Sequence, residues 1–133
     1  MSKTLRLILG DQLNSNHSWF KTVDDSVTYV MMEIRSETDY AKHHIQKVVG
    51  FFSAMRSFAA ELQSKNHKVI YIHLNDSNNL QSFDKNIQHL IEKENFTHFE
   101  YQLPDEYRVD ETLKNFCKTL SIANSVIDSE HFF

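Results

Sequence analysis

The chain has 133 residues, 41% of them hydrophobic and 24% charged, which is the composition of one ordinary globular domain with a core of its own. Its formal net charge is −4 and it has no cluster of five or more lysines and arginines, so the basic surface of an independent nucleic-acid-binding domain is missing. Its longest apolar stretch, residues 48–52, is too short to span a membrane, and the single Cys117 cannot form an internal disulfide, so we expect a cytoplasmic protein.

The first predicted elements are two strands separated by an irregular polar segment. Residues 5–9 form an apolar run that ends at Gly10, one of only two glycines in the chain. Residues 14–25 are mainly polar, and residues 27–34 are rich in β-branched and bulky apolar side chains, as is typical of a strand.

The clearest predicted element is a helix that begins near the capping candidates of residues 36–39 and continues to about residue 64. Its apolar side chains recur at spacings of three and four, which predicts a face buried along much of the helix. Gly50 inside this helix costs about 1 kcal/mol relative to alanine. Close packing of the helix on the sheet explains this glycine, and a ligand ring lying against the helix is the alternative.

Strand and helix signals continue to alternate to the end of the chain. Further strands are predicted at residues 68–74, 97–102 and 125–128, with helices around residues 83–91 and 104–120. The alternation predicts an α/β fold with a mainly parallel sheet. No closing helix follows the last strand, so we expect residues 1–133 to be a single domain from the N-terminal part of a longer protein.

Polar residues near the predicted strand ends suggest a ligand site. In open α/β sheets, ligands bind at the carboxyl ends of the strands where the strand order reverses, and right-handed crossovers make the first strand central. The segments expected to converge there contain Gly10, Asp11, Gln12, Glu33, Ile34 and Glu37. A tight turn at Gly10, a loop cap at Asp11 and a first-turn helix acid at Glu37 are simpler explanations for each residue alone. Their combination favours a pocket.

The sequence has no motif for metal binding, for nucleotide phosphates or for nucleophilic catalysis. The histidines lack HxH, HExxH and cysteine-supported spacings, and neither GxGxxG nor a P-loop occurs. Nothing resembles a nucleophile elbow. We therefore expect no metal and no catalytic residue in this chain.

Four stretches together resemble one protein family. They are LILGDQL at residues 7–13, EIRSETDYAKHHIQK at 33–47, FFSAMRSFAAEL at 51–62 and LPDEYRV at 103–109. The family is that of the deoxyribodipyrimidine photolyase-related proteins, the iron–sulfur bacterial cryptochromes and (6-4) photolyases. The resemblance runs the whole length of the chain but covers only the N-terminal quarter or so of the family's architecture.

The resemblance implies a Rossmann-like, three-layer domain with a five-stranded parallel sheet that holds an antenna chromophore, 6,7-dimethyl-8-ribityllumazine. It also implies that FAD, a 4Fe-4S cluster and the DNA-binding surface belong to a helical C-terminal region, which would be the partner of this domain. The chain alone would then harvest light without repairing DNA, and the parent protein would be a DNA photolyase or a cryptochrome. No membrane is involved.

The resemblance also assigns positions in the pocket. The polar segments of the family's pocket correspond to Gly10, Asp11, Glu33 and Glu37, and the helix that lines it corresponds to Phe51, Phe52 and Met55. Phe51 stands where a smaller aliphatic side chain is expected, and Gly50 stands where bulk is expected. A smaller side chain at position 50 and a larger one at position 51 would change the shape of the pocket and therefore which chromophore fits it.

Two other functions stay open on the sequence. The first is an interaction domain that docks the helical region without a bound chromophore. The second is a receiver-like phosphoacceptor domain, whose acidic pocket Gly10 and Asp11 could imitate, with Asp76 after the third strand as the phosphate acceptor. A receiver also needs a lysine at the end of the fifth strand, and residues 125–133 contain none.

Overall fold

Strands and helices alternate along the chain in the computed structural model, which describes residues 3–10, 12–34, 45–104 and 107–127. The elements are β1 (Thr4–Leu7), the short 3-10 helix η1 (Ser18–Phe20), β2 (Val27–Met32), α2 (Ile45–Ser64), β3 (Lys68–Ile72), α3 (Phe83–Glu94), β4 (His98–Gln102), α4 (Tyr107–Thr119) and β5 (Ala123–Ile127). None of the described helices is long and apolar enough to cross a membrane.

The five strands form one parallel sheet in the order β3-β2-β1-β4-β5, so the predicted α/β fold and the central place of the first strand are confirmed. Leu7 of β1 is paired with Val30 of β2 on one side and Tyr101 of β4 on the other. The strand order reverses at β1, because the chain moves outward to β3 and then returns to β4 on the opposite side.

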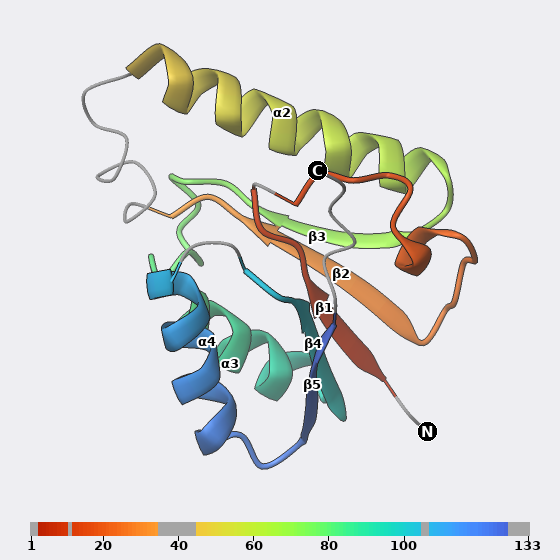
Figure 1. The fold of residues 1–133 in the computed structure, drawn as a ribbon, viewed down its shortest axis with the longest axis vertical. Helices are drawn as coiled ribbons and strands as arrows, with labels where there is room; N and C mark the ends of the chain where they lie inside the picture. Colours follow the sequence, from red (N-terminus) through yellow and green to blue (C-terminus); the bar gives the residue numbers. More distant parts are fainter. Residues whose placement is uncertain (1–2, 11, 35–44, 105–106, 128–133) are drawn as a thin grey trace.

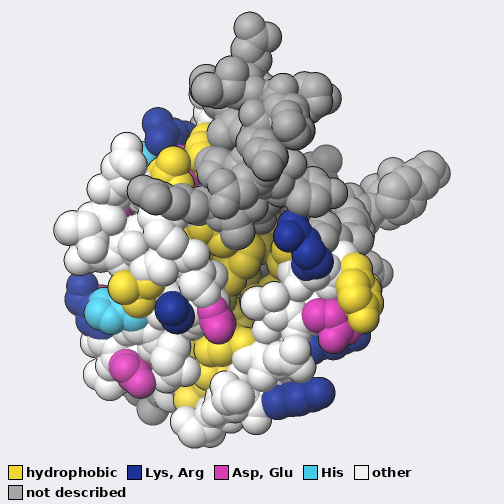
Figure 2. Space-filling view, turned by 90° about the vertical axis from the view of Figure 1, so that its left-hand side faces the viewer, with side chains coloured by type: hydrophobic (Ala, Val, Ile, Leu, Met, Phe, Trp, Pro, Cys, Tyr) yellow, Lys and Arg dark blue, Asp and Glu magenta, His cyan; other side chains and the backbone are white. Residues whose placement is uncertain are grey.

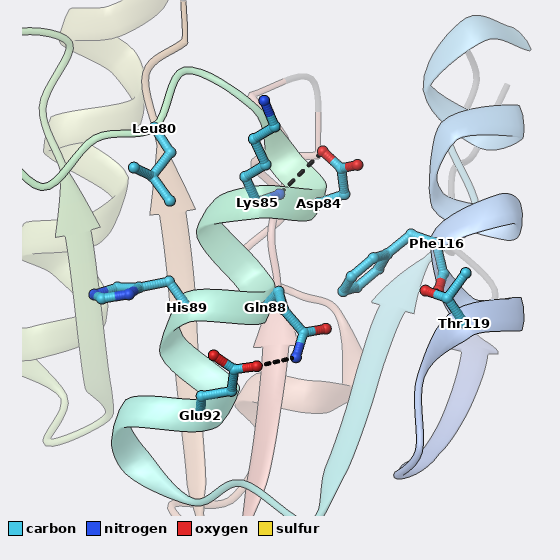
Figure 3. A pocket seen from close by; sticks show the side chains of 8 residues that line it. All are labelled: Leu80, Asp84, Lys85, Gln88, His89, Glu92, Phe116 and Thr119. Atoms are coloured by element: carbon cyan, nitrogen blue, oxygen red, sulfur yellow. Dashed lines mark hydrogen bonds between the residues drawn. The ribbon is translucent and has the colours of Figure 1, made fainter.

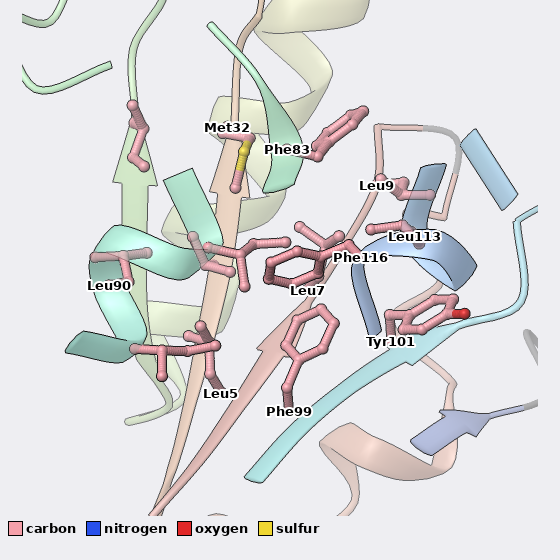
Figure 4. Close-up of a cluster of buried hydrophobic side chains, with 14 of the residues drawn as sticks. Leu5, Leu7, Leu9, Met32, Phe83, Leu90, Phe99, Tyr101, Leu113 and Phe116 are labelled. Atoms are coloured by element: carbon pink, nitrogen blue, oxygen red, sulfur yellow. The ribbon is translucent and has the colours of Figure 1, made fainter. Parts of the chain in front are cut away.

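The helices cover both faces of the sheet, which makes the predicted three-layer sandwich (Figure 1). Helix α2 lies on one face, while α3 and α4 lie together on the other. Because successive strand residues point to opposite faces, the buried side chains divide into two clusters. The α3–α4 cluster contains Leu5, Leu7, Leu9, Val30, Met32, Ile34, Phe99, Tyr101, Leu113 and Phe116 among others (Figure 4). The α2 cluster contains Ile8, Trp19, Val27, Tyr29, Met31, Phe52, Met55, Phe58, Ala59 and Leu62.

The segment between β1 and β2 is more ordered than its polar sequence indicates. Helix η1 carries Trp19, which is 7% exposed and belongs to the α2 cluster. The hydroxyl of Tyr29 donates to the Trp19 carbonyl over 2.9 Å, and the Trp19 amide donates to Nδ1 of His17 over 3.1 Å. Apolar anchors at single positions therefore fix a segment that has no regular periodicity.

Candidate functional site

Apolar side chains form a wall on the α2 face near the carboxyl end of the sheet. Phe52 and Met55 of α2 are 8% and 2% exposed, and they belong to one buried cluster with Ile8 after β1 and Met31 of β2. Phe52 and Met55, which the sequence predicted to line a pocket, therefore pack in one cluster with Ile8, the residue that follows β1.

Gly10 lies in a tight turn that follows β1 after Ile8 and Leu9. The Gln12 amide donates to the Leu9 carbonyl over 2.9 Å across this turn, and Gly10 does not have a positive φ. The side chain of Gln12 is 2% exposed. Its Oε1 accepts from the Leu9 amide at 3.1 Å, and its Nε2 donates to the carbonyls of Gln102 and Leu103 at 3.2 and 3.3 Å. Gln12 therefore fastens the loop after β1 to the end of β4.

Glu33, directly after β2, is fully buried at the same edge of the sheet. Its two carboxylate oxygens accept from Nε and Nη2 of Arg56 at 2.7 and 2.9 Å. They also accept from the hydroxyl of Tyr71 and from the backbone amide of Leu74, the latter at 3.0 Å. One carboxylate thus joins β2 to α2, to β3 and to the segment after β3, and its oxygens are occupied by protein donors.

The surroundings of Glu33 favour its charged form. Burial on its own would raise the pKa of Glu33, but the hydrogen bonds from Arg56, Tyr71 and Leu74, with the charge of Arg56, hold the pKa below its ordinary value. Burial and the bond to Glu33 raise the pKa of Tyr71. Glu33 is therefore a carboxylate and Tyr71 a neutral hydrogen-bond donor throughout the neutral range.

The Glu33 network predicts a pH-dependent contribution to stability. Because the pKa of Glu33 is lower in the folded chain than its ordinary value of 4.5, its contribution is complete above that pH and is lost as the pH falls through the folded-state pKa. The difference in unfolding free energy between wild type and Glu33→Gln should shrink as the pH falls from about 7 to about 3. Urea titrations across this range measure it, and a constant difference would contradict the assignment.

The remaining predicted site residues are placed differently from one another. Ile34 is 1% exposed but belongs to the α3–α4 cluster, so it lies on the opposite face from Phe52 and Met55. Asp11 and Glu37 lie outside the described residues, as does the side chain of Phe51.

Three residues at this edge were not predicted from the sequence as site residues. Arg56 and Tyr71 hold Glu33, and the signal that could have found Arg56 is its place next to Met55 in the buried stripe of α2. Gln102, the last residue of β4, is 1% exposed, and neither atom of its amide has a hydrogen-bond partner among the described residues. An unsatisfied buried polar group costs about 1–3 kcal/mol. The alternation of apolar and polar residues along this strand predicts that Gln102 is exposed, so nothing in the sequence indicated that Gln102 belongs to a site.

A hollow with hydrophobic side chains at its centre lies on the side of the molecule that carries α3 and α4 (Figure 2). The groove between these helices has a volume of about 440 Å³, and its lining consists of Leu80, Asp84, Lys85, Gln88, His89, Glu92, Phe116 and Thr119 (Figure 3). Gln88 donates to Glu92 over 3.0 Å, and His89 points away from Phe116. The polar groups of this groove do not converge on one point, and no group of three metal-ligating side chains occurs in the described part of the chain.

Comparisons with known proteins agree on one family. The sequence profile described as deoxyribodipyrimidine photo-lyase-related protein matches residues 6–133. A (6-4) photolyase of Agrobacterium fabrum (strain C58) is 32% identical to the chain over 129 residues. This alignment covers 96% of the chain and 25% of the relative, so the chain spans about a quarter of the length of the curated relative that it matches.

A comparison of structures supports the fold alone. The solved structure of hypothetical protein MJ0577 superposes with a TM-score of 0.52, over 99% of each chain and at 14% sequence identity. The two chains therefore share an α/β architecture.

Proposed function

Because the chain belongs to the deoxyribodipyrimidine photo-lyase-related protein family, we propose that it is a light-harvesting domain that binds 6,7-dimethyl-8-ribityllumazine. The binding site is the carboxyl edge of the sheet on its α2 face. When bound, the lumazine supplies absorption of near-ultraviolet or blue light and dipole coupling to a flavin. The observation that carries the proposal is the wall of Phe52 and Met55 beside the end of β1, where the family resemblance assigns the chromophore.

The described residues fit the chemistry of a lumazine. Such a ligand has a polar pyrimidinedione edge, an apolar dimethyl edge and a polyol tail, so it needs apolar walls and a few fixed polar groups. In this proposal Phe52, Met55 and Ile8, which form one buried cluster, would contact the apolar part of the ligand, and the amide of Gln102, which has no partner among the described residues, would contact its polar edge. Glu33 acts through Arg56 and Tyr71 as a positioning residue, because protein donors occupy its oxygens.

The proposal gives this chain no chemical step of its own. Transfer of excitation by dipole coupling requires no general acid, base or nucleophile. FAD, the 4Fe-4S cluster and the contacts with DNA are proposed for a further region of the parent protein, which would be a DNA photolyase or a cryptochrome. That region would be the partner of this domain.

Titration of the purified chain with the lumazine, followed by the fluorescence of the ligand, tests the proposal. We expect saturable binding that Glu37→Ala or Asp11→Ala weakens, because the resemblance assigns these acids to the polar part of the pocket. Glu61→Ala is the matched control, since Glu61 is an exposed acid on α2. Fluorescence that stays unchanged at high micromolar protein would contradict the proposal.

A docking role is the second candidate, and exposed apolar side chains favour it. Leu103 after β4, Tyr107 at the start of α4 and Val126 of β5 are 47%, 74% and 51% exposed. Such side chains on neighbouring elements are suited to contact another region of the parent protein. Sedimentation of the chain with the separately produced remainder of the parent tests this role. Tyr107→Asp with Val126→Asp should weaken association, and unchanged association would count against it.

A further inference from the structure

The side chain of Gln102, the last residue of β4, points from the sheet toward its α2 face. Phe99 and Tyr101 of β4 both belong to the α3–α4 cluster, where Figure 4 shows their rings. Because side chains alternate along a strand, Glu100 and Gln102 point the other way. Glu100 agrees with this direction, since it accepts a hydrogen bond over 2.8 Å from Arg6, whose guanidinium lies over the ring of Trp19 in the α2 cluster.

Gln102 interrupts an apolar row that crosses the sheet on this face. Its partner on β5 is Ile127, which packs against the α2 cluster. On its other side is Ile8, one residue beyond the last β1–β4 pair, followed by Met31 of β2. Ile8 and Met31 are 1% and 0% exposed. A carboxamide therefore lies between apolar neighbours in this row.

The amide of Gln102 is buried, and its own backbone is held in place. The residue is 1% exposed, and neither Oε1 nor Nε2 has a hydrogen-bond partner among the described residues. Its backbone carbonyl accepts from Nε2 of Gln12 at 3.2 Å. Buried polar groups in folded proteins are nearly always paired. Among the described residues, this amide therefore has a free donor and a free acceptor in an apolar row, and two groups of a bound ligand would satisfy both.

We propose that Gln102 is a specificity-determining residue that recognises the imide edge of a planar heterocycle. Its Oε1 would accept from the ring N–H, and its Nε2 would donate to an adjacent ring carbonyl. A pyrimidinedione offers these two groups side by side, so the inference rests on the proposed function and deepens it. The apolar neighbours Ile8 and Met31 would exclude water and strengthen both hydrogen bonds.

The test compares two ligands on two proteins. The 133-residue chain and its Gln102→Leu variant are titrated with 6,7-dimethyl-8-ribityllumazine and with its N3-methyl derivative, which lacks the imide N–H. Loss of two hydrogen bonds should weaken lumazine binding by Gln102→Leu roughly tenfold or more. Wild type should prefer the unmethylated ligand by a similar factor, whereas Gln102→Leu should bind both equally. The methylated ligand tests the pairing without changing the protein.

Two controls isolate the amide. Gln63→Leu makes the same substitution at an exposed position of α2 and should bind lumazine as wild type does. Ligand-free Gln102→Leu should unfold at or above the wild-type temperature, because the substitution removes an unsatisfied buried group.

The outcomes separate this inference from the proposed function. If wild type binds lumazine, and neither Gln102→Leu nor N3-methylation weakens binding, the inference is wrong while the antenna proposal stands. Riboflavin, which carries the same imide edge, is titrated in parallel. If riboflavin binds in a Gln102-dependent way and lumazine does not bind, the role of Gln102 stands, and the proposed chromophore is wrong. Binding of neither ligand would overturn both.

Discussion

Replacing Glu33 by alanine should destabilise the chain by about 3 kcal/mol, since this removes a buried, hydrogen-bonded carboxylate. Glu33 is fully buried and accepts from Arg56, Tyr71 and the Leu74 amide. Arg56 can regain water because its side chain is 53% exposed. Tyr71 and Leu74 would keep polar groups without their acceptor, so the loss exceeds that expected from an ordinary ion pair at the surface.

Urea unfolding followed by circular dichroism measures the effect of Glu33→Ala. Glu61→Ala is the matched control, because Glu61 is 46% exposed and pairs with Lys65 over 3.7 Å within α2. An exposed pair of this kind contributes less than about 0.5 kcal/mol. Similar small losses in both variants would show that the Glu33 network does not hold the carboxyl edge of the sheet together.

Replacing Phe99 by alanine should cost about 4 kcal/mol, the largest effect we expect from a single substitution. Phe99 is 0% exposed, and its ring centroid lies 5.8 Å from that of Tyr101 and 6.0 Å from that of Phe116. Figure 4 shows these rings in the cluster between the sheet and α4. Truncation would remove apolar contacts and leave a cavity that the flanking strands cannot collapse to fill.

The Phe99 experiment also tests on which face the ligand binds. Unfolding free energy is compared with that of Tyr107→Ala, an aromatic truncation at a position that is 74% exposed and should change stability little. At a temperature where Phe99→Ala is folded, its lumazine affinity should match wild type, because Phe99 faces α3 and α4 rather than α2. A large loss of lumazine affinity in the folded variant would mean that the ligand binds on the α3–α4 face, which would contradict the proposed site.

The strand predictions show where burial and pairing differ. The sequence predicted a second strand over residues 27–34, whereas β2 ends at Met32. Glu33 and Ile34 continue the buried pattern, and the Glu33 amide still donates to the Ile72 carbonyl over 2.9 Å. Apolar periodicity reports burial, which continues past the last regular pair of a strand, so the predicted strand extended beyond the observed one.

The candidate site could be predicted from the sequence only as a location. Strand order and the rule for open parallel sheets point to the carboxyl edge beside β1, and the apolar stripe of α2 predicts that Phe52 and Met55 line a site there. The sequence prediction assigned both Glu33 and Ile34 to the pocket, although adjacent residues of an extended segment point to opposite faces of the sheet. The roles of individual polar residues there depended on partners that no local pattern specifies.

The sequence by itself determined the α/β fold, the central first strand and the buried stripe of the long helix, because periodicity is a local property that each segment carries. Only the tertiary structure decided which polar groups pair within the protein. Glu33 meets Arg56 across 23 residues of sequence and Tyr71 across 38, and Gln12 meets the Gln102 carbonyl across 90. These contacts exist only after the strands assemble, and they occupy Glu33 and Gln12 while the Gln102 amide lies buried and without a partner among the described residues.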